Sequence, residues 1–397
     1  MITKLTVRNY KCLADVTLEP GDFTVLVGPN SSGKSTLLDV LEFTKDALTD
    51  SLPTALDRRG GIQLLRRRSG GHPTNVSVEM EFRNRENTVH GCYGFTIKAE
   101  QNYAYSVQEE SCQVTVSGNL TGGRQEVRFG RDRGRLSTSF EGINVKLDDR
   151  RLALPVIAAH PLLAHAHDIL TSVAVYSIQP DKLREAQEPT EGQVLRKDGS
   201  NAASVLRELM SSRRDVYDRV SEMLSHVSPG VSAPGTGHRG RQLALTFKVD
   251  VGAPSKWEFE SFLMSDGTLR LLGILLALEQ RRNLEVLGVE EPEATIHPGA
   301  LAILMDALKA ATSHAQVIIT THSPDILDQV DIGSIHCVGL VRGQTRISPP
   351  SFAARDTAKQ SLMSPGELMR ANALEPDETE LEAVASSPPA LFGTDWQ

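Results

Sequence analysis

The sequence is poor in aromatic residues, in positive charge and in long apolar runs. Phe, Trp and Tyr make up 5% of the 397 residues, and the formal net charge at pH 7 is −8. This charge excludes a protein that is basic overall, so any contact with nucleic acid would need a local patch. The strongest apolar run, residues 269–278, includes Arg270 and is about half as long as a membrane span. We expect it to be a buried helix, and we expect no membrane contact.

Cysteine is also scarce. The four cysteines form no CxxC pair and have no paired-histidine spacing; they are Cys12, Cys92, Cys112 and Cys337. This pattern argues against a disulfide framework and against a zinc site, and it fits a reducing compartment. The N-terminus carries no apolar signal core. We therefore expect a cytoplasmic protein.

The two ends of the chain have the pattern of one α/β domain. Residues 23–27 (FTVLV) form a continuous apolar run followed by glycine, which is typical of a strand buried on both faces. Residues 35–48 carry leucines at helical spacing. We assign residues 1–56 and 240–345 to this domain. Its other expected elements are strands at 2–8, 16–19, 240–251, 284–289 and 316–320, and helices at 268–282 and 299–312.

The middle of the chain, residues 57–239, reads as an insertion of α+β type. Short alternating runs such as 76–82, separated by turn residues, predict antiparallel strands over 57–150. Residues 200–227 have a helical pattern. We expect this insertion to form a lid or arm. The C-terminal segment, 346–397, ends in 22 residues that contain acids but no Lys or Arg, so we expect a flexible acidic tail.

The strongest motif is Gly28-Pro-Asn-Ser-Ser-Gly-Lys-Ser-Thr36, which matches the phosphate-binding P-loop pattern. It stands after the apolar strand and before the helix, where backbone N–H groups and a helix N-terminus bind phosphate oxygens. Lys34 is then expected to reach the β- and γ-phosphates of ATP, and Ser35 to bind Mg²⁺. The expected nucleotide-binding residues are Asn30, Ser31, Ser32, Gly33, Lys34, Ser35 and Thr36.

A second motif, Val286-Leu-Gly-Val-Glu-Glu-Pro292, is an apolar strand that ends in two acids. Such a strand tip can deliver one carboxylate to the shell of Mg²⁺ and another to the attacking water. Glu290 takes the first role and Glu291, as general base, takes the second. Paired acids after a strand are also common as solvated loop ends, but the position downstream of a P-loop favours the catalytic interpretation.

Two weaker motifs follow the same pattern. Ser265-Asp-Gly267-Thr-Leu-Arg270 precedes the apolar helix, and a turn of this kind offers a hydroxyl, a backbone N–H and a helix dipole to an anion. On the residues alone, Ser265 is better explained as a helix N-cap. The run Val317-Ile-Ile-Thr-Thr-His322 delivers a histidine at a strand tip, which is usually structural but can contact a γ-phosphate.

The order and spacing of these motifs resemble the ABC-type ATPases in their RecF/SMC-like branch. SDGTLR, EEPEATIHP and TTHSPDIL are also similar to bacterial stand-alone ATPases related to the OLD proteins. The resemblance implies an α/β P-loop NTPase fold with an ABC-ATPase-like head and ATP hydrolysis with Mg²⁺. It also implies an ATP-dependent head-to-tail homodimer in which Ser265 and Gly267 touch the ATP of the partner subunit. His322 becomes the γ-phosphate sensor, and 294–298 faces the partner.

The chain also departs from this family. The signature lacks the LSGGQ of transporters, Glu290 replaces the commoner Asp, and the Q-loop glutamine stays open between Gln63 and Gln179. OLD proteins carry a Toprim nuclease domain after the ATPase core. Here about 75 residues follow His322 and the sequence contains no D-x-D, so we expect no built-in Toprim nuclease.

Two clusters of arginines could neutralise DNA phosphates, and binding would then weaken with salt. The first is Arg58, Arg59, Arg66, Arg67 and Arg68; the second is Arg124, Arg128, Arg131, Arg133 and Arg135. Both could equally be solvated loops balanced by neighbouring acids. Two functions follow. In one, the ATP-gated dimer contacts duplex DNA in repair, recombination or phage defence. In the other, it is a switch or scaffold for a separately encoded effector protein such as a nuclease or toxin.

Overall fold

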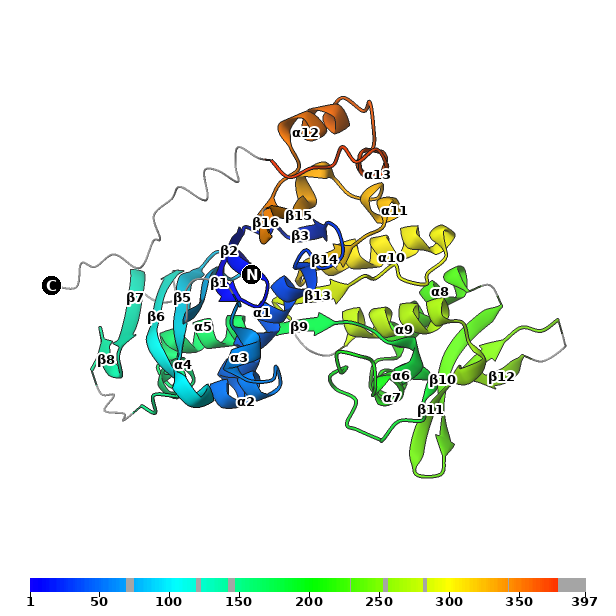
Figure 1. Cartoon of the computed structure of the whole chain (residues 1–397). Helices are drawn as coiled ribbons and strands as arrows, with labels where there is room; N and C mark the ends of the chain where they lie inside the picture. The colour runs from blue at the N-terminus through cyan, green and yellow to red at the C-terminus, as the bar shows by residue number, and fades with distance from the viewer. Residues whose placement is uncertain are drawn as a thin grey trace. The chain divides into compact units, whose positions relative to one another are not determined.

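The computed structural model describes residues 1–68, 75–118, 123–141, 147–228, 230–252, 256–280, 284–341 and 343–377 (Figure 1). The chain divides into two compact units. Unit 1 contains Met1, Asp22–Val25 and Ser172–Gln329, and unit 2 contains Ile2–Gly21, Leu26–Thr171 and Val330–Gln397. Strand β3 (Phe23–Val27) contributes one part to each unit.

This division differs from the boundaries expected for an insertion over 57–239. Residues 57–171 belong to unit 2, whereas 172–239 belong to unit 1. The reason is strand β9 (Val173–Tyr176), which pairs in parallel with β13 (Val286–Glu290) and so ties the following segment to the second half of the chain. The expected acidic tail lies outside the described residues, apart from its first two.

Unit 2 is built around an antiparallel sheet with strand order β2-β1-β4-β5-β6-β7-β8. Buried and more exposed side chains alternate along its strands. In β4 (Asn75–Arg83) every second side chain is buried, as the pattern at 76–82 predicted. Helix α5 (Pro161–Thr171) contacts four neighbouring strands of the sheet, β4 to β7, and covers that face. The other strands are β1 (Ile2–Tyr10), β2 (Leu13–Leu18), β5 (Val89–Ala99), β6 (Tyr105–Gly118), β7 (Gly123–Asp132) and β8 (Arg135–Thr138).

Helix α1 (Lys34–Asp46) follows β3 in unit 2 and confirms the predicted helix after the P-loop. It buries Leu37, Leu38 and Leu41, the same leucine stripe that predicted it. A π-helical turn, Ala47–Ser51, leads into α2 (Leu52–Asp57) and then α3 (Ile62–Leu65). The rest of unit 2 comprises η2 (Gln101–Tyr103), α4 (Leu154–Ile157), η5 (Ile332–Ser334), β15 (Ile335–Val341), β16 (Gln344–Ser348), α12 (Phe352–Lys359) and α13 (Pro365–Arg370).

Unit 1 has a parallel core. Strand β13 pairs on one side with β9 and on the other with β14 (Gln316–Thr321), and the N–H of Val317 donates to the carbonyl of Asp22 at 2.8 Å. All six residues of β14 are buried, as expected for a strand covered on both faces. Helices α9 (Asp266–Glu279) and α10 (Pro298–Ala311) pack against each other, and α11 (Pro324–Leu327) contacts α10.

Three further helices of unit 1 pack against α9. The single helix expected over 200–227 is two helices, α7 (Ala202–Ser212) and α8 (Arg214–Val227), because Arg213 has non-helical backbone angles (φ −141°, ψ 62°). Helix α6 (Pro180–Arg184) also contacts α9. A three-stranded antiparallel sheet contains β10 (Val231–Arg239), β11 (Gln242–Val249) and β12 (Trp257–Glu260), and η4 (Ser261–Leu263) follows it. Within the described ranges, none of the helices is long and apolar enough to cross a membrane.

Candidate functional site

The P-loop of unit 2 has the backbone that phosphate binding requires. Ser31 and Gly33 have positive φ angles of 61° and 109°, so successive N–H groups turn toward the inside of the loop. A Cβ atom on Gly28 would lie 1.9 Å from the carbonyl oxygen of Val338 in β15. Only glycine allows this approach. The loop is therefore shaped by its backbone and by the strand beside it.

Lys34 is held inside this loop. Its side chain is buried, and Nζ donates hydrogen bonds to the carbonyl oxygens of Gly28 and Pro29, each at 2.9 Å. Helix α1 begins at Lys34 with no side chain capping it, which leaves its first N–H groups for an anion. Ser35 is exposed at this helix end. A buried cation, an uncapped helix and an exposed hydroxyl fit the phosphates of a nucleoside triphosphate.

Further contacts support the P-loop from sites that sequence reasoning missed. The hydroxyl of Thr345 in β16 donates to the carbonyl of Ser32 at 2.8 Å, and Cys12 Sγ lies 3.4 Å from the hydroxyl of Thr36. Ser32 Oγ is buried and has no hydrogen-bond partner among the described residues. Its hydroxyl could therefore form a hydrogen bond with a ligand. Asn30 and Ser31 are exposed. Nothing in the local sequence marks Thr345 or Cys12, because they act through the fold.

Unit 1 carries the two predicted acids at the tip of β13. Glu290 Oε1 lies 3.8 Å from Nζ of Lys197, a cation that the sequence analysis did not identify. Glu291 is in a left-handed conformation (φ 43°), and its N–H donates to the carbonyl of Thr320 at 3.0 Å. The two neighbouring carboxylates have different partners, Lys197 for Glu290 and His322 for Glu291. This is the arrangement that different roles for the two acids would need.

The end of β14 lies beside Glu291. His322 Nε2 is 3.5 Å from Glu291 Oε1, so the predicted base and the predicted sensor are neighbours. A third acid, Glu293, accepts hydrogen bonds from the hydroxyl of Thr321 at 2.5 Å and from the N–H of His322 at 3.2 Å. Glu293 lies within the EEPEATIHP segment, but no spacing rule in the sequence assigned it a role.

The predicted signature lies at the start of α9, also in unit 1. Ser265 is the N-cap of this helix and accepts a hydrogen bond from the N–H of Thr268 at 3.2 Å, so it has the geometry of the simpler interpretation. The Asp266 carboxylate pairs with Arg184 of α6. A Cβ atom on Gly267 would lie 2.6 Å from the carbonyl oxygen of Thr295, so glycine is required where the signature meets the turn after Glu291.

Arg270 joins the same group of residues. Its Nη1 donates to the carbonyl of Glu291 at 3.1 Å, and its Nε is buried without a hydrogen-bond partner among the described residues. Burial lowers the pKa of Arg270, and the carboxylates of Glu291 and Glu293 oppose that shift. The structure thus gathers the expected P-loop residues in unit 2 and Glu290, Glu291, His322 and the signature in unit 1.

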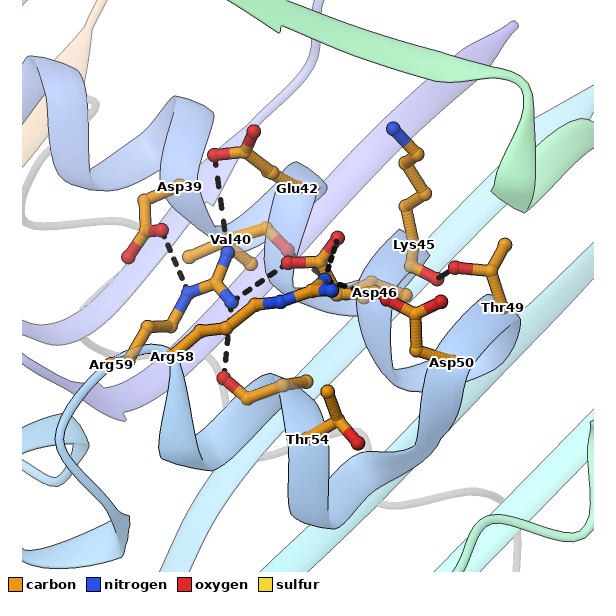
Figure 2. A network of polar contacts seen from close by, with 12 residues as sticks. Asp39, Val40, Glu42, Lys45, Asp46, Thr49, Asp50, Thr54, Arg58 and Arg59 are labelled. Atoms are coloured by element: carbon orange, nitrogen blue, oxygen red, sulfur yellow. Dashed lines mark hydrogen bonds and ion pairs between the residues drawn. The ribbon is translucent and has the colours of Figure 1, made fainter. Parts of the chain in front are cut away.

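The structure corrects the first basic cluster at Arg59. Its side chain is only 7% exposed, and it pairs with Asp39 at 2.8 Å and with Asp46 at 3.0 Å. Figure 2 shows both Arg58 and Arg59 pointing into acids of α1 and the turn that follows, and Arg58 pairs with Asp50 at 2.6 Å. The expectation of DNA contact is therefore wrong for Arg59, because its guanidinium group is buried in ion pairs within unit 2.

The rest of that cluster is anchored but more open. The N–H of Arg67 donates to the carbonyl of Asn9 at 2.8 Å, and the N–H of Lys11 donates to the carbonyl of Leu65 at 2.6 Å, so the segment is tied to the turn between β1 and β2. Arg66 and Arg67 are half-buried, and Arg68 is exposed.

The second cluster needs a similar correction. Arg131 has a fully buried side chain that pairs with Asp149 at 3.0 Å and donates to the carbonyl of Arg151 at 2.7 Å. It cannot reach DNA in this fold. The other four members are exposed on β7, β8 and the turn between them, and they are Arg124, Arg128, Arg133 and Arg135.

Comparison with known families matches residues 23–328 to the family described as "AAA domain, putative AbiEii toxin, Type IV TA system". Among curated proteins, the OLD nuclease of Thermus scotoductus (strain ATCC 700910 / SA-01) is 38% identical over 52 residues. That match covers 13% of this chain and 10% of the nuclease, so the chain spans only a small part of that relative's length. Both matches agree with the predicted resemblance to OLD-related ATPases.

Solved structures confirm the fold class. One is an SMC head bound to the C-winged helix domain of ScpA, with a TM-score of 0.55, 16% identity, and 89% of this chain and 98% of that chain covered. Another is an Smc head with an extended coiled coil bound to the C-terminal domain of ScpA, from Pyrococcus furiosus, with a TM-score of 0.55, 13% identity, and 91% and 99% covered. At these identities the likeness shows the P-loop NTPase fold of an SMC-type head and nothing further.

Proposed function

Because the chain belongs to the family described as "AAA domain, putative AbiEii toxin, Type IV TA system", we propose that it binds ATP with Mg²⁺ and hydrolyses it. The observation that carries this proposal is the P-loop itself. Lys34 is buried at the start of an uncapped 13-residue helix, in a loop that closes on β15 only because Gly28 has no side chain. Inward-turned N–H groups and a buried lysine at a helix N-terminus are the features of a phosphate-binding loop.

The binding roles follow from the chemistry of each group. Lys34 supplies positive charge to the β- and γ-phosphates, and the N–H groups of residues 30–36 donate to phosphate oxygens. Ser35 and Glu290 offer oxygen ligands of the kind that Mg²⁺ prefers. When bound, Mg²⁺ would neutralise charge that develops on the phosphates. Asn30, Ser31, Ser32, Gly33 and Thr36 complete the proposed nucleotide site.

Hydrolysis then needs a base and a group that senses the γ-phosphate. Glu291 takes a proton from water, and the water oxygen attacks the γ-phosphorus while its bond to the bridging oxygen of ADP breaks. ADP and inorganic phosphate leave. His322, 3.5 Å from Glu291, donates a hydrogen bond to the γ-phosphate and orients the water. These roles are our proposal for unit 1 residues acting on nucleotide held by the P-loop.

Two substitutions test this function. Lys34→Ala removes the phosphate cation, so fluorescent ATP binding and turnover should both be lost. Glu291→Gln should keep nucleotide binding and slow hydrolysis by about 10²–10⁴-fold, because it removes only the base. Glu285→Gln, at the other end of the same strand segment, is the control and should behave as wild type. Normal turnover in Glu291→Gln would show that Glu291 is not the base.

We further propose that the active form is a homodimer with shared sites. Ser265 and Gly267 would contact ATP bound by the partner subunit, and residues 294–298 would lie at the interface. Mixing inactive Lys34→Ala with inactive Ser265→Arg should restore about a quarter of wild-type turnover, since head-to-tail pairing leaves one site of each heterodimer intact. Rescue should be accompanied by an ATP-dependent heterodimer in size-exclusion chromatography. Neither rescue nor heterodimer would leave a monomeric ATPase with Ser265 as an N-cap.

The partner that this ATPase serves is the second question. The likeness to an OLD nuclease and the open side of Arg66–Arg68 support duplex DNA contact in repair or phage defence. The burial of Arg59 and Arg131 weakens that proposal and favours the alternative, a switch or scaffold for a separately encoded effector protein. Stimulation of ATP turnover by duplex DNA at about 100 mM salt, abolished by more salt, would support DNA. Absence of stimulation with co-purification of a defined second polypeptide would support the effector.

A further inference from the structure

A third acid in unit 1, Glu293, fixes the backbone that carries His322. Its Oε1 accepts hydrogen bonds from the Thr321 hydroxyl at 2.5 Å and from the His322 N–H at 3.2 Å. The Thr321 oxygen accepts a further bond from the Ser323 N–H at 2.9 Å. One carboxylate oxygen therefore organises three consecutive residues at the end of β14.

The turn that presents Glu293 is a constrained piece of backbone. Glu291 and Thr295 have positive φ angles of 43° and 66°, a conformation that costs a non-glycine residue about 1–2 kcal/mol. Two hydrogen bonds close the turn, from the Ala294 N–H to the Glu291 carbonyl at 3.1 Å and from the Ile296 N–H to the Glu293 carbonyl at 2.9 Å. Contacts to the end of β14 help to offset the cost, so the turn and the strand end hold each other.

The contact between the Glu291 and His322 side chains is weak. The side chains of Glu291 and His322 are 49% and 30% exposed, and Glu291 Oε1 lies 3.5 Å from His322 Nε2. An exposed pair of this kind contributes about 0–1 kcal/mol, too little to hold two side chains in one geometry. The backbone under each residue therefore contributes to their relative position. For His322, that backbone is fixed by Glu293.

The second oxygen of Glu293 takes no part in holding the end of β14. Oε2 is buried and has no hydrogen-bond partner in the described part of the chain. Leaving such a group unpaired is unfavourable, so we expect the neutral side chain of glutamine, which keeps one acceptor oxygen, to be tolerated here. The nearby Arg270 guanidinium, which donates to the Glu291 carbonyl, partly balances the charge.

We propose that Glu293 is a positioning residue for ATP hydrolysis, holding His322 beside Glu291 in the geometry that the reaction needs. This inference rests on the proposed hydrolysis by Glu291. Glu293→Ala removes the acceptor and frees the end of β14. It should lower kcat about 10–100-fold, the range expected when a reacting group moves by about 1 Å, and leave the affinity for fluorescent ATP within about 2-fold of wild type. Glu293→Gln retains an acceptor oxygen and should keep most of the activity.

The decisive measurement is the effect of Glu293→Ala in two backgrounds. His322→Ala should itself slow turnover, and adding Glu293→Ala to it should slow turnover by less than about 2-fold more, because nothing is left to position. A general loss of structure would lower kcat equally in both backgrounds. Glu285→Ala, which breaks a 3.0 Å contact with the N-terminal amine at the start of the same segment, is the matched control and should not change kcat.

Several outcomes would overturn the proposal. Full activity of Glu293→Ala, an unchanged rate for His322→Ala, or additive losses in the double variant would each do so. If Glu293→Ala fails to fold, Glu293→Asp decides: its shorter side chain cannot reach Thr321, so it should be slow while Glu293→Gln is active. If Glu291→Gln hydrolyses normally, the proposed function fails first, and the two failures are thereby distinguished.

Discussion

The two halves of the proposed site are built in different ways. The P-loop of unit 2 is shaped by its backbone: glycine where β15 approaches, positive φ angles at Gly28, Ser31 and Gly33, and carbonyl groups that bind Lys34. The acid tip of unit 1 is shaped by side chains: Glu293 holds the end of β14, and Arg270 holds the Glu291 carbonyl. A single glycine substitution in the P-loop should therefore cause a large loss of ATP binding. Single substitutions at the acid tip should each cause a smaller, partial loss of ATP turnover.

The largest expected effect is at Gly28. An alanine there would place its Cβ 1.9 Å from the Val338 carbonyl, and because that atom is backbone, the loop must move. We expect affinity for ATP to fall by about 100-fold or more, measured with a fluorescent analogue, since a misplaced loop loses several phosphate hydrogen bonds at once. Gly61→Ala, at another positive φ (84°) but with nothing within 4 Å of its Cβ, is the control for backbone strain without a clash and should bind ATP normally. Tight binding by Gly28→Ala would show that the loop tolerates displacement.

The next largest effect is on the free energy of unfolding, and it should differ between the neighbouring residues Arg58 and Arg59. Arg59→Met removes a buried guanidinium that pairs with the partly buried carboxylates of Asp39 and Asp46. Because Lys11 and Tyr10 still contact Asp39 and Arg58 still contacts Asp46, we expect a loss of about 1.5–3 kcal/mol of unfolding free energy. Arg58→Met, at a side chain 52% exposed, should cost less than about 1 kcal/mol. Urea denaturation measures both. Equal decreases in stability would mean that the Figure 2 network does not depend on burial.

The same pair has a defined dependence on pH. Burial raises the pKa of Asp39, but Arg59, Lys11 and Tyr10 outweigh burial and lower it overall. A carboxyl group with a lowered pKa in the fold stabilises the protein above its ordinary value of about 3.9 and loses that contribution as the pH falls through the folded value. The stability difference between wild type and Arg59→Met should therefore be full at pH 7 and shrink in strong acid.

A smaller effect is expected at Gly267, where the acid tip meets the signature. Alanine favours a helix by about 1 kcal/mol relative to glycine, yet its Cβ would lie 2.6 Å from the Thr295 carbonyl. The turn has to shift, so we expect ATP turnover to fall about 10-fold without loss of thermal stability. Gly299→Ala, in the first turn of α10 and no closer than 3.3 Å to another atom, should be neutral. Normal turnover would mean that the signature and the turn are not coupled.

The smallest effect concerns DNA. Reversing the charge at Arg66, Arg67 and Arg68 should flatten the salt dependence of duplex binding, with basal ATP turnover unchanged. The log–log slope should decrease by about 0.9 for each DNA phosphate that these side chains no longer neutralise. A matched reversal at Arg124, Arg133 and Arg135 shows whether the second cluster contributes. Unchanged slopes in both variants would leave these arginines as solvated surface and favour the effector protein.

The sequence predicted correctly those strands and helices that are marked by the pattern of their own residues. FTVLV predicted β3 at its observed limits, and the leucine spacing predicted α1, because burial on known faces leaves a periodic pattern. The break at Arg213 was missed, since no glycine or proline marks it. We expected the central segment to end at residue 239, but unit 2 gives way to unit 1 after Thr171. The sequence does not show this boundary, because it depends on pairing between β9 and β13, whose residues are more than 100 positions apart.

The same limit explains what was missed near the motifs. Thr345 supports the P-loop from more than 300 residues away, and Lys197 reaches Glu290 from a loop with no motif. Arginine clusters are a further case, because a basic run in a sequence does not show which members are buried. Arg59 is held in the interior by ion pairs with Asp39 and Asp46, and both acids are on a helix that precedes it in the sequence.

Buried Arg131 also has a consequence for proteolysis. The bond after Arg151 has the sequence that trypsin cleaves, but its carbonyl oxygen accepts a hydrogen bond from Arg131 Nη1 at 2.7 Å. A serine protease must bind that same oxygen in its oxyanion hole, so cleavage requires this segment to open first. Trypsin should therefore cut after the exposed Arg133 or Arg135 well before it cuts after Arg151, and the delay reports how firmly the segment before α4 is held to the sheet.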